Sequence, residues 1–344
     1  MTVVPKQTIA PMEALPVRAI PAGPDLQYEP KWDGFRCIIF RDRDEIEIQS
    51  KAGKSLARYF PEIVSAVRAL PPARFVLDGE LVIPRPEGLS FDALLARIHP
   101  ANSRVMRLAA ATPALVIIFD LLGTPQGESM VDRPLRQRRR ELESFARCFF
   151  RSGGAFRLSP ATTRLDEARR WLSQVGSTLD GIMVKHLDLP YRSGDRSGMQ
   201  KIKNYRSADC VVGGFRFNEG RDVVGSLLLG LFDEQGRLDH VGFTSTIRAA
   251  DKRMLTAKLE PLIGPPGFTG NKPGGPSRWS SERSAAWIPL RPALVVEVCY
   301  DHFSGGRFRH GTQILRWRPD KEPRQCTFEQ VRQTSADLTK LLGA

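Results

Sequence analysis

One short turn near residue 31 constrains this chain more than any other stretch of its sequence. Lys31 stands between the acidic Glu29 and the dipeptide Asp33-Gly34, and the apolar segment 37–40 follows soon after. Asp-Gly is a typical turn sequence, so we expect a strand, a tight turn and a second strand here. A lysine held in such a turn can be aimed at one electrophile, as a nucleophilic amine must be. An ordinary turn with a lysine facing water explains these residues equally well when they are taken alone.

The length and composition are those of a globular protein that can form two domains. The chain has 344 residues, of which 41% are hydrophobic and 26% are charged, without an apolar run long enough to span a membrane. Its start lacks the charged and then apolar pattern of a secretory signal. The five cysteines are scattered without a Cys-x-x-Cys pair, which argues against a zinc knuckle or a disulfide framework. We therefore expect a protein of the reducing cytoplasm.

The charge balance favours a polyanionic partner. Fifty-one basic residues against 38 acidic residues give a formal net charge of +13, and the pI is near 9.9. An excess of this size is typical of proteins that bind nucleic acid. Many basic proteins bind no nucleic acid, so the charge supports this interpretation without establishing it.

Hydrophobic patterns divide the first two thirds of the chain among strands and helices. Strict alternation in 45–49 predicts a strand with one buried face, and the apolar run 115–119 predicts a buried strand. Further strands are expected at 37–40, 75–83 and 180–185. Apolar residues fall at helical spacing in 63–70, 91–98, 133–145 and 165–175. The third of these helices carries arginines that we expect on a solvated face, namely Arg136, Arg138, Arg139 and Arg140.

The sequence changes character near Arg206, where we place a domain boundary. Beyond it, short strand patterns separated by turns are found at 209–217, 226–232, 238–244 and 294–300. A helix is expected at 254–262, and the segment 264–276 is too rich in proline and glycine for regular structure. Short strands with one helix in a basic module of this size predict a small barrel of the OB type. The predicted domains are therefore 1–206 and 207–344.

Four charged motifs lie at the ends or centres of apolar strand patterns. In chain order they are K-x-D-G from Lys31, D-G-E ending at Glu80, D-G-x-x-V-K from Asp180 to Lys185, and K-x-K from Lys201 to Lys203. Each motif alone has an ordinary explanation, since a carboxylate in a strand can pair with a neighbouring lysine and two lysines can mark an edge strand. Their joint occurrence in this order indicates one site.

The residue types fit phosphoryl transfer with a lysine nucleophile. Neighbouring cations would favour the neutral, nucleophilic form of Lys31 and would bind a phosphoryl group. These cations are Arg36, Lys185, Lys201 and Lys203. Glu80 and Asp180 offer hard oxygen ligands for magnesium and acceptors for a ribose. Phe119 is large and flat enough to stack on a nucleobase.

Taken together, the motifs resemble those of the covalent nucleotidyltransferases, which include ATP-dependent DNA ligases, RNA ligases and mRNA capping enzymes. The resembling motifs cover nearly the whole chain and are K-x-D-G-x-R at 31–36, Ser50-Lys51-Ala52-Gly53, Leu77-Asp78-Gly79-Glu80, Phe119-Asp120-Leu121, 180–185, Lys201-Ile202-Lys203 and 316–321. Within this superfamily the chain looks most like the small bacterial ATP-dependent DNA ligases of the stand-alone ligase C type. Its two-domain size and the segments 277–280, 295–298 and 308–310 resemble that group.

The resemblance implies an α+β fold and roles for the residues around the nucleotide. A nucleotidyltransferase domain (ATP-grasp-like, antiparallel sheets with helices) would be followed by a β-barrel OB-fold domain. Lys31 would form the lysyl-AMP phosphoramidate. Glu29 would meet the adenine amino group, Phe119 would stack on the ring, and Glu80 would hold the ribose.

The resemblance further implies contacts to the phosphates, the metal and the nick. Arg36 and Lys51 would lie near the ribose or the nick, and Asp180, with Glu80, would bind Mg²⁺ or Mn²⁺. The phosphates would be contacted by Lys185, Lys201 and Lys203. The residues that would close over ATP and orient the leaving pyrophosphate are Arg316, Arg318, Asp320 and Lys321. Two positions depart from many relatives: Lys51 stands where they have Arg, which costs bidentate geometry, and Asp180 stands where they have the longer Glu.

The implied activity is that of an ATP-dependent DNA ligase acting in DNA repair. AMP would pass from Lys31 to the 5′-phosphate of a nick, which the 3′-hydroxyl would then seal, while the second domain swings about the region near Arg206 between steps. We expect a monomer that binds nicked or gapped duplex DNA and no membrane, at the nucleoid of a bacterial cytoplasm, with any repair partners on separate chains.

An RNA ligase or a capping-type nucleotidyltransferase is the alternative, although Glu29 suits an adenine amino group better than a guanine carbonyl. A non-catalytic nucleic-acid-binding module is disfavoured by the intact motifs. NAD as the donor is disfavoured by the lack of a zinc-type cysteine cluster and of an additional recognition domain.

Overall fold

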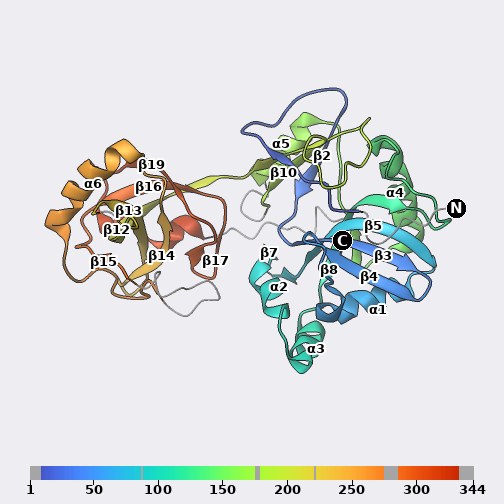
Figure 1. The fold of residues 1–344 in the computed structure, drawn as a ribbon, viewed down its shortest axis with the longest axis horizontal. Helices are drawn as coiled ribbons and strands as arrows, with labels where there is room; N and C mark the ends of the chain where they lie inside the picture. The colour runs from blue at the N-terminus through green and yellow to red at the C-terminus, as the bar shows by residue number, and fades with distance from the viewer. Residues whose placement is uncertain (1–8, 87, 175–178, 221, 275–285, 333–344) are drawn as a thin grey trace. The chain divides into compact units, whose positions relative to one another are not determined.

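The computed structural model describes residues 9–86, 88–174, 179–220, 222–274 and 286–332. By their mutual contacts these residues form two units, the first ending at Asn204 and the second running from Tyr205 to Arg332 (Figure 1). The division falls beside Arg206, where the sequence pattern changes. Among the helices in the described ranges, none is long and apolar enough to cross a membrane.

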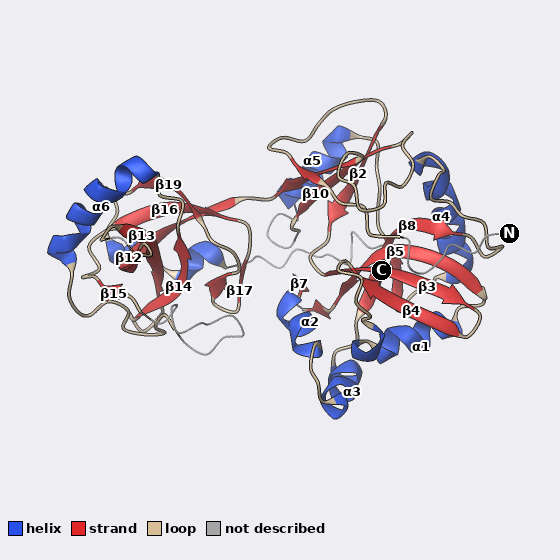
Figure 2. Cartoon of the chain, viewed as in Figure 1, coloured by secondary structure: helices blue, strands red, loops and turns tan. Residues whose placement is uncertain are grey.

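The first unit combines strands and helices in an irregular order along the chain (Figure 2). Its strands are β1 (Leu15–Pro16), β2 (Leu26–Lys31), β3 (Phe35–Asp42), β4 (Glu45–Ser50), β5 (Arg74–Val82), β6 (Pro84–Arg85), β7 (Gly88–Leu89), β8 (Leu115–Gly123), β9 (Phe156–Leu158), β10 (Gly181–His186) and β11 (Met199–Lys203). Its α-helices are α1 (Pro61–Ala69), α2 (Phe91–Arg97), α3 (Asn102–Ala111), α4 (Leu135–Phe149) and α5 (Leu165–Gln174). Each strand and helix predicted in this part of the chain is present, and α3 is an addition that the patterns did not indicate.

The larger sheet of this unit has the strand order β4-β3-β5-β8-β9. The first four strands pair antiparallel, and β9 joins β8 in parallel. Strand β8 is buried along almost its whole length, which explains its continuous apolar sequence. Helices α1 and α4 contribute Ile63, Val67, Leu142 and Phe145 to the core of this sheet. Across the strands Arg36 lies opposite Glu80, so two predicted site residues are direct neighbours.

The smaller sheet has the strand order β1-β11-β10-β2. Strands β2, β10 and β11 pair antiparallel, and β1 pairs with β11 in parallel. Helix α5 packs on this sheet, with Ala168 and Trp171 buried in a core that also includes Phe119 and Ile182. Because Phe119 belongs to β8 and Ile182 to β10, this core joins the two sheets face to face.

The turn at residues 32–34 connects the two sheets, since β2 ends at Lys31 and β3 begins at Phe35. Trp32 is 5% exposed, and its Nε1–H donates a hydrogen bond of 3.0 Å to Ser159 Oγ. A Cβ atom at Gly34 would overlap the carbonyl oxygen of Leu81, so only glycine allows the chain to pass so close to β5. The lysine is therefore fixed by strand pairing on one side and by a packed turn on the other.

The second unit is mainly a sheet with the order β14-β13-β12-β16-β19, and β15 pairs with β12. Its elements are β12 (Arg206–Phe217), β13 (Val224–Phe232), β14 (Leu238–Thr244), α6 (Lys252–Leu259), β15 (Ile288–Pro289), β16 (Val295–Tyr300), β17 (Phe303–Ser304), β18 (Arg307–Phe308) and β19 (Gln313–Trp317). The edges approach at a single bridge between Thr244 and Thr312, next to β19. The expected OB-type sheet is present, but within the described residues it is not a fully closed barrel, because this one bridge takes the place of a continuous ladder.

The solvated arginine face predicted for helix α4 is wrong for two of its residues. Arg138 and Arg139 are 2% and 8% exposed. The Arg138 guanidinium donates to both carboxylate oxygens of Asp120, at 2.9 and 3.0 Å, which compensates the charge that burial would otherwise leave unpaired. The segment 277–280, which contributed to the family resemblance, lies outside the described residues.

Candidate active site

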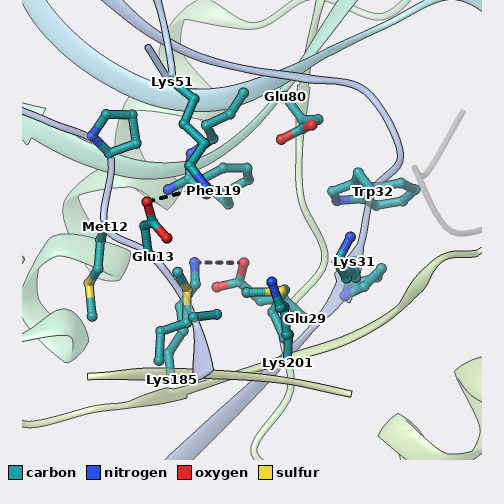
Figure 3. A pocket seen from close by; sticks show the side chains of 16 residues that line it. Met12, Glu13, Glu29, Lys31, Trp32, Lys51, Glu80, Phe119, Lys185 and Lys201 are labelled. Atoms are coloured by element: carbon teal, nitrogen blue, oxygen red, sulfur yellow. Dashed lines mark hydrogen bonds and ion pairs between the residues drawn. The ribbon is translucent and has the colours of Figure 1, made fainter. Parts of the chain in front are cut away.

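A cavity of about 150 Å³ in the first unit gathers most of the predicted site residues (Figure 3). The predicted residues that line it are Glu29, Lys31, Arg36, Lys51, Glu80, Phe119, Lys185 and Lys201. Asp180 and Lys203 are not lining residues but adjoin it, since Asp180 directly precedes β10 and Lys203 pairs with Gly181. The predicted cations of the segment 316–321 lie in the second unit.

The smaller sheet presents its charged residues to the cavity in rows. Glu29, Met183 and Lys201 are paired across β2, β10 and β11, and the next row along the sheet includes Lys31 and Lys203. Side chains two positions apart on a strand point to the same face. The spacing of these residues along each strand therefore places them on one side of the sheet.

The Lys31 amine forms an ion pair with the Asp180 carboxylate. The side chains are 20% and 12% exposed, and the Asp180 backbone N–H also donates to the Lys31 carbonyl oxygen, at 3.2 Å. Gly181, with φ of +148°, passes so close to β11 that a Cβ atom would overlap the carbonyl oxygen of Ile202. The D-G pair thus brings a carboxylate to the lysine through a backbone conformation that favours glycine.

Glu29 is a buried carboxylate with both of its oxygens occupied. Lys185 Nζ donates to its Oε2 at 2.8 Å, and Gln27 Nε2 donates to its Oε1 at 2.7 Å. The Glu29 and Lys185 side chains are 2% and 9% exposed. Lys185 Nζ also lies 4.7 Å from the centroid of the Phe119 ring. A charge pair buried this deeply depends on both partners being present.

Arg36 is held over the Phe119 ring, and both residues belong to the larger sheet. Its Nε and Nη2 atoms each donate to Asp78 at 2.6 Å, and its guanidinium carbon lies 4.3 Å from the Phe119 ring centroid. The bidentate geometry fixes the plane of the guanidinium. Phe119 therefore has a cation–π contact from each of two residues, one on each sheet.

The electrostatic environment of the cavity moves the pKa of two lining residues toward neutrality. Burial raises the pKa of the Glu80 carboxyl to about 7, against the opposing influence of Arg36 and Lys31. Burial, followed by the charges of Lys31 and Lys203, lowers the pKa of Lys201. Groups whose pKa moves toward neutrality within a cavity are typical of sites that transfer protons or bind charged ligands.

The N-terminal strap, residues 9–14, forms one wall of the cavity. Pro11, Met12, Glu13 and Ala14 line it. The Glu13 carboxylate pairs with Lys51 at 3.2 Å and with Arg196 at 2.9 Å; Figure 3 marks the Lys51 pair with a dashed line. These pairs are partly exposed, so they orient the strap more than they stabilise it.

The predicted cations of the second unit are each paired with a carboxylate. Arg316 Nε donates to Glu297 at 2.6 Å. Arg318 binds Asp209 through Nη1 at 3.0 Å and Asp320 through Nη2 at 2.8 Å. Lys321 Nζ donates to the same Asp209, at 2.7 Å. The hydrogen bond from Arg318 lowers the pKa of Asp320 to about 2.

Comparisons with known proteins decide the family. Residues 11–203 match the family described as ATP dependent DNA ligase domain, and residues 220–321 match the ATP dependent DNA ligase C terminal region. The chain belongs to the ATP-dependent DNA ligase family. It is 44% identical over 339 residues to DNA ligase C2 of Mycolicibacterium smegmatis, an alignment that covers 94% of each chain. It is 43% identical over 338 residues to DNA ligase C of Mycobacterium tuberculosis, covering 94% of this chain and 93% of that one.

The fold of this ligase also resembles solved structures. A structure of a Lig E DNA ligase aligns with a TM-score of 0.54 at 17% identity, covering 90% of this chain and 100% of the other. At this identity the likeness concerns the fold alone. The expected resemblance to the small bacterial ligase C type and the expected fold, a nucleotidyltransferase domain with an OB-like domain, are confirmed.

The part of the ligase that the structure describes offers carboxylate donors for a metal ion without a dedicated protein cage. Within the described residues, no three His, Cys, Asp or Glu side chains are grouped so that they could hold a metal. Glu80 lines the cavity and the Asp180 carboxylate faces Lys31. Mg²⁺ in phosphoryl-transfer sites is commonly bound by one or two carboxylates together with water and substrate phosphates. Glu80 and Asp180 are carboxylates of the type that such a site uses.

Several lining residues of the ligase were missed by the sequence patterns. Met183 and Met199 stand in the same rows as the predicted lysines, and the two-residue spacing from Met183 to Lys185 was a signal that could have found Met183. Trp32 lies inside the K-x-D-G motif itself. Met12 and Glu13 reach the cavity through contacts distant in sequence, for which no local pattern exists.

Proposed function

We propose that this ligase seals nicks in duplex DNA through a lysyl-AMP intermediate on Lys31. The supporting observation is that Lys31 lies in one cavity with the residues expected to bind adenosine and phosphate. As part of this proposal, residues 1–206 are the adenylation domain and residues 207–344 the OB-fold domain.

The reaction has three displacements at phosphorus. The Lys31 amine, once deprotonated, attacks the α-phosphorus of ATP, and a P–N bond forms as pyrophosphate leaves. An oxygen of the DNA 5′-phosphate then attacks the same AMP phosphorus, and Lys31 leaves as the amine. Finally the 3′-hydroxyl loses its proton and attacks the 5′-phosphorus, which forms the phosphodiester and releases AMP.

Residues of both sheets are assigned to the adenine, the ribose and the phosphates of the nucleotide. Phe119 stacks on adenine, and Glu29 meets its amino group while Gln27 keeps that carboxylate oriented. Glu80 binds the ribose. Lysines of the smaller sheet meet the phosphates, where their charge is most useful as negative charge develops; these are Lys185, Lys201 and Lys203. Arg36 and Lys51 serve the ribose or the nick.

Asp180 serves the nucleophile. Its carboxylate holds the Lys31 ammonium before the reaction, and this pair must separate when the amine becomes neutral and attacks. A divalent cation, Mg²⁺ or Mn²⁺, bound by Asp180 and Glu80, would supply charge neutralisation at the phosphates. Arg316, Arg318, Asp320 and Lys321 act in the first displacement, on the pyrophosphate, after the second domain has moved about the region near Arg206.

The nucleic-acid partner is proposed to be nicked or gapped duplex DNA in repair. The net charge of +13 favours backbone contacts that do not depend on sequence. The chain is proposed to act as a monomer at the bacterial nucleoid, with any repair partners on other chains.

The test is a strand-sealing assay with a 5′-labelled nicked DNA duplex, ATP and Mg²⁺, read as product length on a denaturing gel. The wild type is expected to join the strands and Lys31→Ala to join none, while Lys54→Ala, a change at an exposed loop lysine outside the cavity, should seal normally. A parallel duplex carries its nick in an RNA strand. Faster sealing of the RNA nick would move the protein to the RNA ligases, and sealing by Lys31→Ala would contradict the mechanism.

A further inference from the structure

Tyr191 is a buried tyrosine outside every motif that the sequence singled out. It lies in the loop between β10 and β11 and is 4% exposed. Its hydroxyl donates to Asp78 Oδ2 at 2.6 Å and accepts a hydrogen bond of 2.9 Å from the Met12 backbone N–H. Burial and then the Asp78 carboxylate raise the pKa of Tyr191 well above its ordinary value, so the phenol keeps the proton that it donates.

The hydrogen bond from Tyr191 to Asp78 affects Arg36, because Arg36 binds the same carboxylate. Asp78 is completely buried, and its two oxygens accept the bidentate pair from Arg36 as well as the Tyr191 hydroxyl. The Tyr191 bond therefore fixes the carboxylate that in turn fixes the guanidinium over Phe119, 4.3 Å from the ring centroid. Short bonds to an ionised group are the strong ones in proteins.

The second bond acts on the N-terminal strap. The loop that carries Tyr191 holds the strap at further points. Ala10 N–H donates to Ser193 Oγ at 2.7 Å, Glu13 N–H donates to the Asp195 carbonyl at 2.9 Å, and Arg196 pairs with the Glu13 carboxylate at 2.9 Å. The strap in turn lines the cavity with Met12 and Glu13. One hydroxyl thus joins two walls of the same cavity.

We propose that Tyr191 is a positioning residue for ATP, which holds Arg36 over Phe119 through Asp78 and fastens the strap as the facing wall. This inference rests on the proposed function, because it assumes that the cavity binds the nucleotide. A preformed cavity loses less freedom on binding, so Tyr191 acts on the affinity for ATP more than on the chemical step.

The test compares Tyr191→Phe with Tyr28→Phe in the full chain. Tyr28 is 1% exposed, its hydroxyl donates to the Pro21 carbonyl at 2.8 Å, and it is not a lining residue. Tyr191→Phe loses two buried hydrogen bonds, and Tyr28→Phe loses one partly buried hydrogen bond in the same unit. The rate of enzyme adenylation is measured against ATP concentration after bound AMP has been removed with pyrophosphate, and urea unfolding is measured in parallel.

Tyr191→Phe is expected to raise the KM for ATP about tenfold, because it loses a hydrogen bond to a charged group. It is expected to change kcat by less than about threefold. Tyr28→Phe is expected to leave both constants unchanged. A KM for Tyr191→Phe within twofold of the wild type, or an equal rise for Tyr28→Phe, overturns the proposal.

A milder variant keeps the test decisive if Tyr191→Phe does not fold. Ser193→Ala removes two hydrogen bonds to the strap, both with the Ala10 backbone, and no buried group. We expect a two- to threefold rise in KM; an unchanged KM overturns the proposal in that case. A wild type that forms no adenylate refutes the proposed function instead, so the two failures are distinct.

Discussion

Glu80 makes the stability of the protein depend on pH, and this dependence can be measured. Its pKa rises from an ordinary 4.5 to about 7, chiefly through burial. Between these values the folded state keeps the proton while the unfolded state has lost it. The wild type therefore loses stability as the pH rises from 4.5 to about 7. Glu80→Gln removes the titration and keeps the shape of the side chain.

The magnitude follows from the shift. A carboxyl displaced this far opposes folding by up to about 3.4 kcal/mol above neutral pH. Glu80 is partly exposed at the cavity wall, where water screens part of the penalty, so we expect about 1–2 kcal/mol between about pH 5 and about pH 8. The Gln variant should match the wild type closely at the lower pH and exceed its stability at the higher pH.

The assay is urea unfolding of both proteins at the two pH values, followed by far-UV circular dichroism. Glu47→Gln, which removes a carboxyl from the same sheet outside the cavity, is the control and should change the free energy of unfolding by less than about 0.5 kcal/mol at either pH. A difference between Glu80→Gln and wild type that is the same at both pH values, or that favours the wild type at the higher pH, would refute the reasoning.

Three further perturbations test the account. Lys185→Met leaves the buried Glu29 carboxylate without its cation and should lower the free energy of unfolding by about 3–5 kcal/mol. Adding Glu29→Gln should recover most of this loss in urea unfolding. A double variant that is no more stable than the single variant contradicts the pairing. Gly181→Ala forces a side chain against the Ile202 carbonyl at φ of +148° and should cost more than about 2 kcal/mol, so an unchanged thermal unfolding curve would be incompatible with the close approach of β10 to β11. Binding to nicked duplex should weaken linearly on a plot of log affinity against log salt, with similar slopes for unrelated sequences; a tenfold preference for one sequence at fixed salt would argue against backbone recognition.

The parts of the site that the sequence predicted lie in short motifs within strands or beside them. Alternation along β2, β10 and β11 places Glu29, Lys31, Lys185 and Lys201 on one face, and a two-residue repeat can be read without knowing the fold. The Asp33-Gly34 turn is predicted by its local turn sequence, although the close approach that requires its glycine is to Leu81 on β5. Once the neighbouring strands pair, these residues come together at one cavity.

The rest depends on partners distant in sequence. Arginine is seldom buried, so a pattern alone puts Arg138 on the surface. Its burial depends on Asp120 on another element and on the carbonyl oxygens of Arg133 and Leu189. The strap has no periodicity, and its place beside the cavity comes from bonds to a loop about 180 residues later. The ion pair between Glu29 and Lys185 likewise joins residues of two different strands. A list of motifs does not show that these residues pair.

The most direct measurement for the central claim is covalent labelling of Lys31. The enzyme, stripped of bound AMP with pyrophosphate, is incubated with α-labelled ATP and Mg²⁺, with labelled GTP and NAD in parallel, and run on a denaturing gel beside Lys31→Ala. We expect acid-labile label on the wild type, from ATP alone, and none on the variant. Label that persists on Lys31→Ala, or a wild type that takes label from no donor, would contradict a lysyl-AMP mechanism at this residue.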